Sequence, residues 1–187
     1  MKSFKAITIV FLLLFSIHTN AQDKWQVADK ETVRLSPTAF SQLPKAVVKY
    51  LQKRGCTVPQ LFGDNKAHNV IRGQFARRKQ FDWAVLCSRN RVSSVLVFWN
   101  GSTKSVSEIA KSPDKNFLQT INGDGKIGFS RAIGVVGKQF IIQHYKWYGG
   151  PKPPPISHHG IDDAFVEKAS TAHYFYRRRW LELQGSD

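Results

Sequence analysis

Residues 81–99 read FDWAVLCSRNRVSSVLVFW, two apolar segments separated by a short basic turn. In an extended chain, successive side chains point to opposite faces. One face of the first segment then carries Phe81, Trp83, Val85 and Cys87, and the other carries Asp82, Ala84 and Leu86. Because both faces are largely apolar, we predict a central strand that is covered on both sides.

A helix is the first candidate for one of these covers. In the stretch LPKAVVKYLQKRG, residues 43–55, the apolar side chains recur at helical spacing. Pro44 suits a first helical turn, and Gly55 suits the C-terminal cap. We therefore predict a helix of about three turns that packs on the strand pair.

The remaining segments are mostly short and rich in β-branched and aromatic residues. We expect strands in NVIRGQF (69–75), SRAIGVV (130–136) and QFIIQHYKWY (139–148), and a terminal hairpin over residues 171–183. SVSEIAKS (105–112) and IDDAFVEK (161–168) are interpreted as short helices, and residues 22–35 as an irregular or edge-strand lead-in. The fold class predicted is α+β, a mainly antiparallel β-sheet of about six or seven strands with one N-terminal helix packed on it.

The first 21 residues have the pattern of a secretory signal. Two lysines precede the apolar run AITIVFLLLFSI, and a small residue, Ala21, ends the segment. An uncleaved anchor or a buried helix is the alternative. We expect cleavage after Ala21, which leaves residues 22–187 as a single α+β domain in a secreted or periplasmic protein. No later segment is apolar enough to be expected to span a membrane.

The chain contains two cysteines, Cys56 and Cys87. Cys56 directly follows the predicted helix, and Cys87 lies in the predicted central strand. An even number of cysteines in an exported chain favours a disulfide, so we predict that these two are bonded and join helix to sheet. Two buried free thiols are the alternative.

The formal net charge of +15 favours anionic partners, such as an envelope polymer. Basic residues cluster in two inferred turns, and these are the candidate anion-binding residues: Arg77, Arg78, Lys79, Arg177, Arg178 and Arg179. Arg89 and Arg91 occupy a further turn, at the opposite end of the meander from residues 77–79. Solvated turns that prevent edge-to-edge association are the alternative. Nucleic acid is not expected as a partner, because no nucleic-acid motif accompanies the charge.

The stretch from Gly73 to Val85 resembles one hairpin of the FG-GAP or VCBS-type repeats of β-propeller proteins. Gly73, Phe75 and Asp82 match that pattern in spacing, as do Ala84 and Val85. The acids that bind calcium in those repeats are replaced by Gln74, Ala76 and Arg78, so no calcium site is expected. The chain as a whole resembles small exported bacterial proteins of unknown function. GCTVPQ, FDWAVLCS and the terminal GIDDAF, KAS, HY and W carry that resemblance, which implies an extracytoplasmic domain and no particular activity.

A proline-rich stretch, GGPKPPPISHHGIDDAF (149–165), leads to a second group of polar residues. This candidate polar site comprises His158, His159, Asp162, Asp163 and His173. Convergence of these side chains would suit zinc. In an extended chain, however, His158 and His159 point in different directions, and the two aspartates suit the start of a helix, where carboxylates cap free N–H groups. No metal site, cofactor or catalytic residue is therefore assigned.

Three functions remain open. The first is a non-enzymatic binding or envelope-associated protein whose partner is an anionic polymer or another protein. The second is a metal-dependent hydrolase that uses the His/Asp group. The third is an inhibitor of a secreted enzyme that inserts the rigid segment GGPKPPP. Nucleophile-elbow, P-loop and dinucleotide motifs are absent from the sequence. The sequence does not determine the oligomeric state.

Overall fold

The computed structural model describes residues 23–121, 123 and 125–186, so the predicted signal segment lies outside the described residues. Within these described residues there are three α-helices, twelve strands and three short 3-10 helices. In chain order they are α1 (Lys24–Glu31), β1 (Arg34–Leu35), η1 (Pro37–Ala39), α2 (Lys45–Lys53), β2 (Val58–Pro59), β3 (Val70–Gly73), β4 (Asp82–Arg89), β5 (Val92–Phe98), η2 (Trp99–Gly101), β6 (Val106–Pro113), η3 (Asp114–Phe117), β7 (Leu118–Ile121), β8 (Lys126–Phe129), β9 (Arg131–Val136), α3 (Lys138–Tyr148), β10 (Gly160–Phe165), β11 (Ala169–Tyr176) and β12 (Arg179–Gln184).

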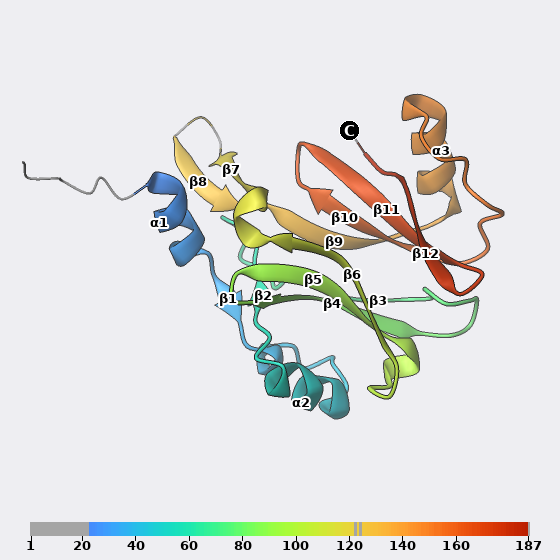
Figure 1. Ribbon diagram of the computed structural model, residues 1–187, viewed down its shortest axis with the longest axis horizontal. Coiled ribbons are helices and arrows are strands. Elements are labelled where there is room, and N and C mark those ends of the chain that lie inside the picture. The colour runs from blue at the N-terminus through green and yellow to red at the C-terminus, as the bar shows by residue number, and fades with distance from the viewer. Residues whose placement is uncertain (1–22, 122, 124, 187) are drawn as a thin grey trace, which may run out of the picture.

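Two four-stranded antiparallel sheets make up most of the structure. One has the order β3-β4-β5-β6 and the other β12-β11-β10-β9, while β1-β2 and β7-β8 are two-stranded. Figure 1 shows the layers from bottom to top as α2, the β3–β6 sheet, the β9–β12 sheet and α3. The α+β class and the antiparallel pairing are as predicted. The strands are more numerous than expected, and the helices are not confined to the N-terminal region.

The alternation of apolar residues in β4 explains this layering. Val85 and Cys87 pack against the buried side chains of α2, whereas Ala84 and Leu86 face the other four-stranded sheet. All four side chains are buried. The prediction of a central strand covered on both sides is confirmed. A third cluster, which includes Ile141 of α3, covers the outer face of the second sheet.

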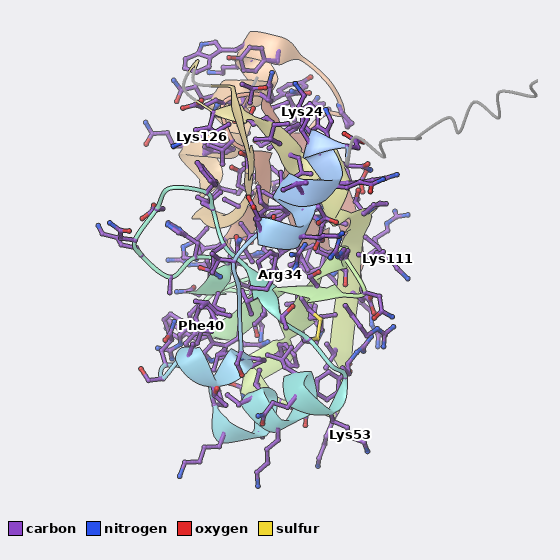
Figure 2. All side chains as sticks on the ribbon, turned by 90° about the vertical axis from the view of Figure 1, so that its left-hand side faces the viewer. Lys24, Arg34, Phe40, Lys53, Lys111 and Lys126 are labelled. Carbon is purple, nitrogen blue, oxygen red and sulfur yellow. A yellow bond between two sulfur atoms is a disulfide. The ribbon has the colours of Figure 1, made fainter. Side chains whose placement is uncertain are left out.

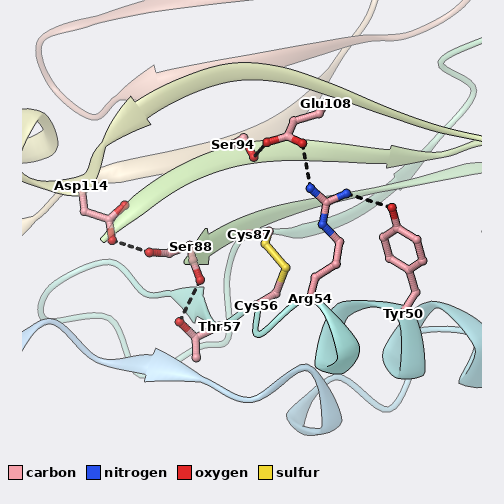
Figure 3. Close-up of a disulfide and its surroundings, with 9 residues drawn as sticks. All are labelled: Tyr50, Arg54, Cys56, Thr57, Cys87, Ser88, Ser94, Glu108 and Asp114. Atoms are coloured by element: carbon pink, nitrogen blue, oxygen red, sulfur yellow. Dashed lines mark hydrogen bonds and ion pairs between the residues drawn. A yellow bond between two sulfur atoms is a disulfide. The ribbon is translucent and has the colours of Figure 1, made fainter. Parts of the chain in front are cut away.

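The predicted Cys56–Cys87 disulfide is present. Beside it, Thr57 and Ser88 exchange two backbone hydrogen bonds of 2.9 and 2.8 Å. Figure 3 shows the disulfide between α2 and the sheet, with Arg54 reaching Glu108 of β6. The disulfide therefore joins α2 to the sheet, as expected from the sequence.

Helix α1 lies away from α2, next to the two-stranded β7–β8 sheet. It occupies part of the stretch that was expected to be irregular or extended, and it packs against β7 and β8. Figure 2 shows Lys24 of α1 and Lys126 of β8 in the upper part of the view. Its anchor is Arg34, which binds Asp29 at 2.8 Å and the fully buried Asp114 at 2.9 Å. The helix is thus fixed by ion pairs that cross between distant parts of the chain.

Three further secondary-structure predictions are wrong. Residues 139–148 belong to helix α3 instead of a strand, because Ile141 packs on the second sheet and Gly149, with φ +78°, ends the helix. Residues 161–165 form β10 instead of a helix start, so Asp162 and Asp163 do not cap one. All of SVSEIAKS except Ser105 lies in β6, where it pairs with β5. The proline-rich segment therefore connects a helix to a strand.

Candidate functional site

Two groups of basic residues lie on exposed loops of the two large sheets. Arg77, Arg78 and Lys79 lie on the loop between β3 and β4. The three consecutive residues Arg177–Arg179 lie at the turn between β11 and β12. All six side chains are exposed, so each group can reach a partner from solvent.

Asp82 fixes the first basic loop to the core. Its side chain is fully buried and accepts four hydrogen bonds, two of them from the backbone N–H groups of Phe75 and Ala76 at 3.0 and 2.9 Å. Gln80 donates a third at 2.7 Å, and the backbone N–H of Asn100 donates a fourth at 2.7 Å. Four donors on one buried carboxylate hold the ends of the loop and the η2 turn together.

A glycine is required at position 73, where the β3–β4 loop begins. A Cβ added at Gly73 would lie 2.6 Å from the ring of Phe75, a distance that real Cβ atoms do not reach. Phe75 itself is fully buried in the core between the sheets. The spacing of Gly73, Phe75 and Asp82 is therefore accounted for by packing and backbone hydrogen bonds, without a metal ion.

Aromatic packing brings the second basic group to the same end. Trp99, next to Asn100, lies 4.7 Å from Phe175 and 5.7 Å from Trp180, measured between ring centroids. Phe175 and Trp180 are directly paired across β11 and β12, just before and just after the basic turn. Figure 1 shows the β3–β4 loop and the β11–β12 turn on the same side of the molecule. The six candidate anion-binding residues thus form one basic end.

The charges of the basic end are available for a partner. Within the described part of the chain, none of the six forms an ion pair. Arg77, Arg78, Lys79, Gln80 and Asn100 line an open depression of about 510 Å³ at its surface. Close by, Arg72 lies over the exposed ring of Phe81, 4.5 Å from its centroid. Cations and an accessible aromatic ring therefore occur together at this end.

Arg89 and Arg91 lie at the other end of the sheet, at the turn between β4 and β5. Arg91 donates to Asp29 of α1 at 2.8 Å. The charge of Arg91 is therefore engaged in holding α1, and these two arginines do not join the basic end.

The second candidate group, around the two aspartates, is divided by the sheet. Asp162 and Asp163 are adjacent in β10, so their side chains point to opposite faces. Asp163 faces the core between the two sheets, where His173 Nε2 lies 3.8 Å from its Oδ2. Asp162 faces the opposite side, and so the two carboxylates do not converge.

Asp163 is the partner of a buried arginine, Arg131, that the sequence did not single out. The guanidinium donates to both carboxylate oxygens, at 2.8 and 2.7 Å. Its remaining donors reach Ser93 Oγ at 2.9 Å, the Ser93 carbonyl at 3.3 Å and the carbonyl of Ala110. The ring of Phe117 lies 4.3 Å away. Arg131 therefore joins the second sheet to β5 and β6, and it has no donor left for a ligand.

Electrostatics agree with this arrangement. Burial raises the pKa of Asp163, but the hydrogen bonds from Arg131 and the nearby His173 more than offset it, so the pKa lies below its usual range. The side chains of Arg131 and Asp163 are only 1% and 9% exposed. A charged pair that is this buried and fully hydrogen-bonded is suited to holding the sheets together and not to contacting a substrate.

The histidines of the group take separate structural positions. His158 stacks on Tyr174 at 4.4 Å and 10°, and its Nδ1 donates to the carbonyl of His159 at 3.1 Å. His159 accepts at Nδ1 from the backbone N–H of Gln74 at 3.2 Å, so it links the two sheets. His173 is buried. Over residues 23–121, 123 and 125–186, no three His, Cys, Asp or Glu side chains are arranged to hold a metal ion.

The position of Asp162, on the face of β10 opposite to Arg131 and Asp163, can be tested by mutation. Burial raises its pKa, and the neighbouring carboxylate of Asp163 acts in the same direction. A raised native pKa means that ionisation at neutral pH costs stability. Asp162→Asn should therefore increase the free energy of unfolding at pH 7, by up to about 1 kcal/mol.

The gain should decline as the pH falls through the raised native pKa and should be lost below the unfolded pKa of about 3.9, where Asp162 becomes protonated in the unfolded chain as well. Urea denaturation at pH 7 and pH 3.5 measures the two values. A variant that is less stable than wild type at pH 7 would show that the Asp162 charge is instead compensated in the native state.

A pocket of about 400 Å³ lies apart from all the predicted residues. It is formed by α1, residues 60–67 and β8, with Val33, Phe62 and Phe129 among its apolar walls. Its size is in the range of small-molecule sites. The sequence contained no signal for it, because its walls come from three segments that meet only in the fold.

Comparison with protein-family models, curated proteins and solved structures finds no match to this chain. Within the described residues, the helices are too short or too polar to span a bilayer.

Proposed function

We propose that this protein is a non-enzymatic, extracytoplasmic binding protein whose basic end binds an anionic polymer of the cell envelope. The observation that carries the proposal is that the two groups, residues 77–79 and 177–179, lie at one end of the two sheets. The disulfide is compatible with an oxidising compartment. The export signal and the identity of the polymer are part of the proposal.

The geometry of the basic end supports a polymer more than a small ligand. Its cations lie on two separate turns, and the depression between Arg77 and Asn100 is open. A polyanion can contact both turns at once and release counterions from each. Because Asp82 and Trp99 hold the bases of the turns, little conformational entropy is lost when the polymer binds.

The proposal predicts a loss of retention on an immobilised sulfated or phosphorylated polymer. One variant carries Arg77→Gln, Arg78→Gln and Lys79→Gln, and a second carries the same change at residues 177–179. For each, the slope of log affinity against log salt should fall by roughly two, at about 0.7 per lost contact. Gradient elution at several salt concentrations measures the slope.

A matched control removes the same charge elsewhere. Lys45, Lys49 and Lys53 are exposed on α2, and Figure 2 shows Lys53 at the outer edge of the molecule. Lys→Gln at these three positions should leave the slope nearly unchanged. Equal losses in all three variants would mean that only net charge matters, and the basic end would not be the binding site. Retention that does not depend on salt would contradict the proposal altogether.

A further inference from the structure

Helix α3 leaves aromatic side chains in solvent at its C-terminal end. Ile141 is fully buried, but Trp147 is 61% exposed and Tyr148 is 44% exposed. An exposed tryptophan of this degree is unusual for a residue that dominates cores and interfaces, so it calls for a partner.

The exposed pair is the end of an ordered stripe. Phe140, His144, Trp147 and Tyr148 are spaced so that they lie along one side of the helix. The centroid of His144 is 3.9 Å from Phe140, 5.5 Å from Trp147 and 5.9 Å from Tyr148. Trp147 and Tyr148 meet edge to face, at 6.2 Å and 80°. Contacts between the rings restrict their rotamers before any partner binds, which lowers the entropic cost of docking.

The charge carried by α3 and the segment that follows it has one sign, although Asp162 of β10 lies close enough to His144 to interact with it electrostatically. From residue 138 to residue 156 the chain contains Lys138, Lys146 and Lys152 and no aspartate or glutamate. All three lysines are exposed. The surface that carries the aromatic pair therefore favours an anionic partner.

We propose that the C-terminal end of α3 docks on anionic lipid headgroups. Trp147 and Tyr148 lie at headgroup depth, and Lys146 and Lys152 contact the phosphates. Trp and Tyr prefer this boundary because each has an apolar body and a polar edge, and each lysine near an anionic surface adds to the attraction. A ligand bound in a cavity fits less well, because side chains this exposed protrude from the surface instead of lining a cavity. The inference is separate from the polymer site, which uses other residues.

Flotation with vesicles tests the proposal on the full folded chain. Wild type should float with vesicles of phosphatidylcholine containing phosphatidylglycerol, and not with phosphatidylcholine alone. Trp147→Ala with Tyr148→Ala should reduce partitioning by about 10-fold or more, as expected for partial burial of two aromatic side chains. Trp25→Ala is the matched control, because Trp25 is an exposed tryptophan (38%) on α1. That variant should float like wild type.

A second readout localises the contact. Brominated acyl chains should quench part of the tryptophan fluorescence of wild type, and Trp147→Phe should remove that quenching. Quenching that persists in Trp147→Phe, equal flotation with neutral vesicles, or normal flotation of the double variant would each overturn the proposal. Self-association that requires Trp147, without flotation, would assign the stripe to a second copy of the chain and would also overturn it.

The polymer-binding proposal and the lipid-docking proposal can be tested independently of each other. The variant with glutamine at residues 77–79 should lose polymer retention and still float with anionic vesicles. The variant with alanine at 147 and 148 should show the opposite behaviour. If flotation is lost only in the first variant, the lipid proposal is overturned and the polymer proposal stands.

Discussion

Arg131→Met is expected to lower the free energy of unfolding by about 3–5 kcal/mol, the usual cost of removing one partner from a buried ion pair. The variant leaves the Asp163 carboxylate buried without its two hydrogen bonds. It also leaves the Ala110 carbonyl without the bond it accepts from Arg131. The loss acts at the junction of the two sheets, so both should unfold together. Urea denaturation at pH 7 measures the change.

The pH dependence distinguishes a lost ion pair from lost packing. The pKa of Asp163 is lowered in wild type, so the pair stabilises the fold above the unfolded pKa of about 3.9, and this is lost as the pH falls through the native value. In Arg131→Met the carboxylate has no partner and prefers to be protonated. The gap between wild type and variant should therefore narrow below about pH 4.

Two further variants of this pair sharpen the test. Arg131→Lys keeps the charge but cannot serve all the acceptors, so it should fall between wild type and methionine. Arg131→Met with Asp163→Leu removes both charges and should be more stable than Arg131→Met alone, because no unpaired buried charge remains. A double variant less stable than the single one would show that the pair contributes through shape and not through charge.

Removing the disulfide by Cys56→Ala with Cys87→Ala is expected to cost about 3–4 kcal/mol, the chain-entropy value for a loop of 31 residues. The native structure should survive, because Thr57 and Ser88 still exchange their backbone hydrogen bonds. Arg54 also still binds Glu108 at 2.9 Å and Tyr50 at 2.9 Å. The effect should therefore arise mainly in the unfolded chain, which becomes less restricted.

Urea denaturation with and without a dithiol reductant measures this effect. Wild type should lose stability on reduction and show a larger m-value, since the reduced unfolded chain is more expanded. The double alanine variant should not respond to the reductant, which makes it the control. Equal midpoints for oxidised wild type and the variant would mean that the native disulfide contributes nothing to stability.

The parts of the fold that the sequence predicts correctly depend on short-range patterns. β4 is apolar on both faces, α2 has a helical repeat, and the terminal hairpin has its turn between two β-rich segments. Each pattern is contained in one short, continuous segment of the chain. The pairing of Cys56 with Cys87 follows because there is only one possible pair within the molecule.

The wrong secondary-structure predictions concern segments whose conformation depends on contacts with residues far away in the sequence. In β10, Ile161, Asp163 and Phe165 share the face toward the other sheet, which is a strand pattern interrupted by a charge. The charge is accommodated by Arg131, 32 residues earlier, and no local feature indicates that pairing. Conversely, α3 has strand-forming residues, but it becomes a helix because the surface it covers needs only a narrow apolar stripe.

The candidate basic residues could be identified from the sequence, but their arrangement could not. The sequence predicts that residues 77–79 and Arg91 lie at opposite ends of the sheet, because successive turns of a meander lie at alternate ends. The proximity of residues 177–179 to residues 77–79 depends on Trp99, which packs on β11 and β12 across the gap between sheets. The exposed position of Trp147 was not predictable either, since it requires knowing that its segment is a helix.

The connectivity of the two large sheets has a kinetic consequence. Strands β3 to β6 follow one another directly, so that sheet can assemble from adjacent hairpins with small loop-closure costs. Strands β9 and β10 are neighbours too, but residues 137–159, including α3, lie between them. Pairing β9 with β10 closes a longer loop, and a longer loop costs more entropy to close, so this pairing is expected to be the slower one. The first sheet is therefore expected to serve as the template on which Arg131, and then Asp163, complete the second.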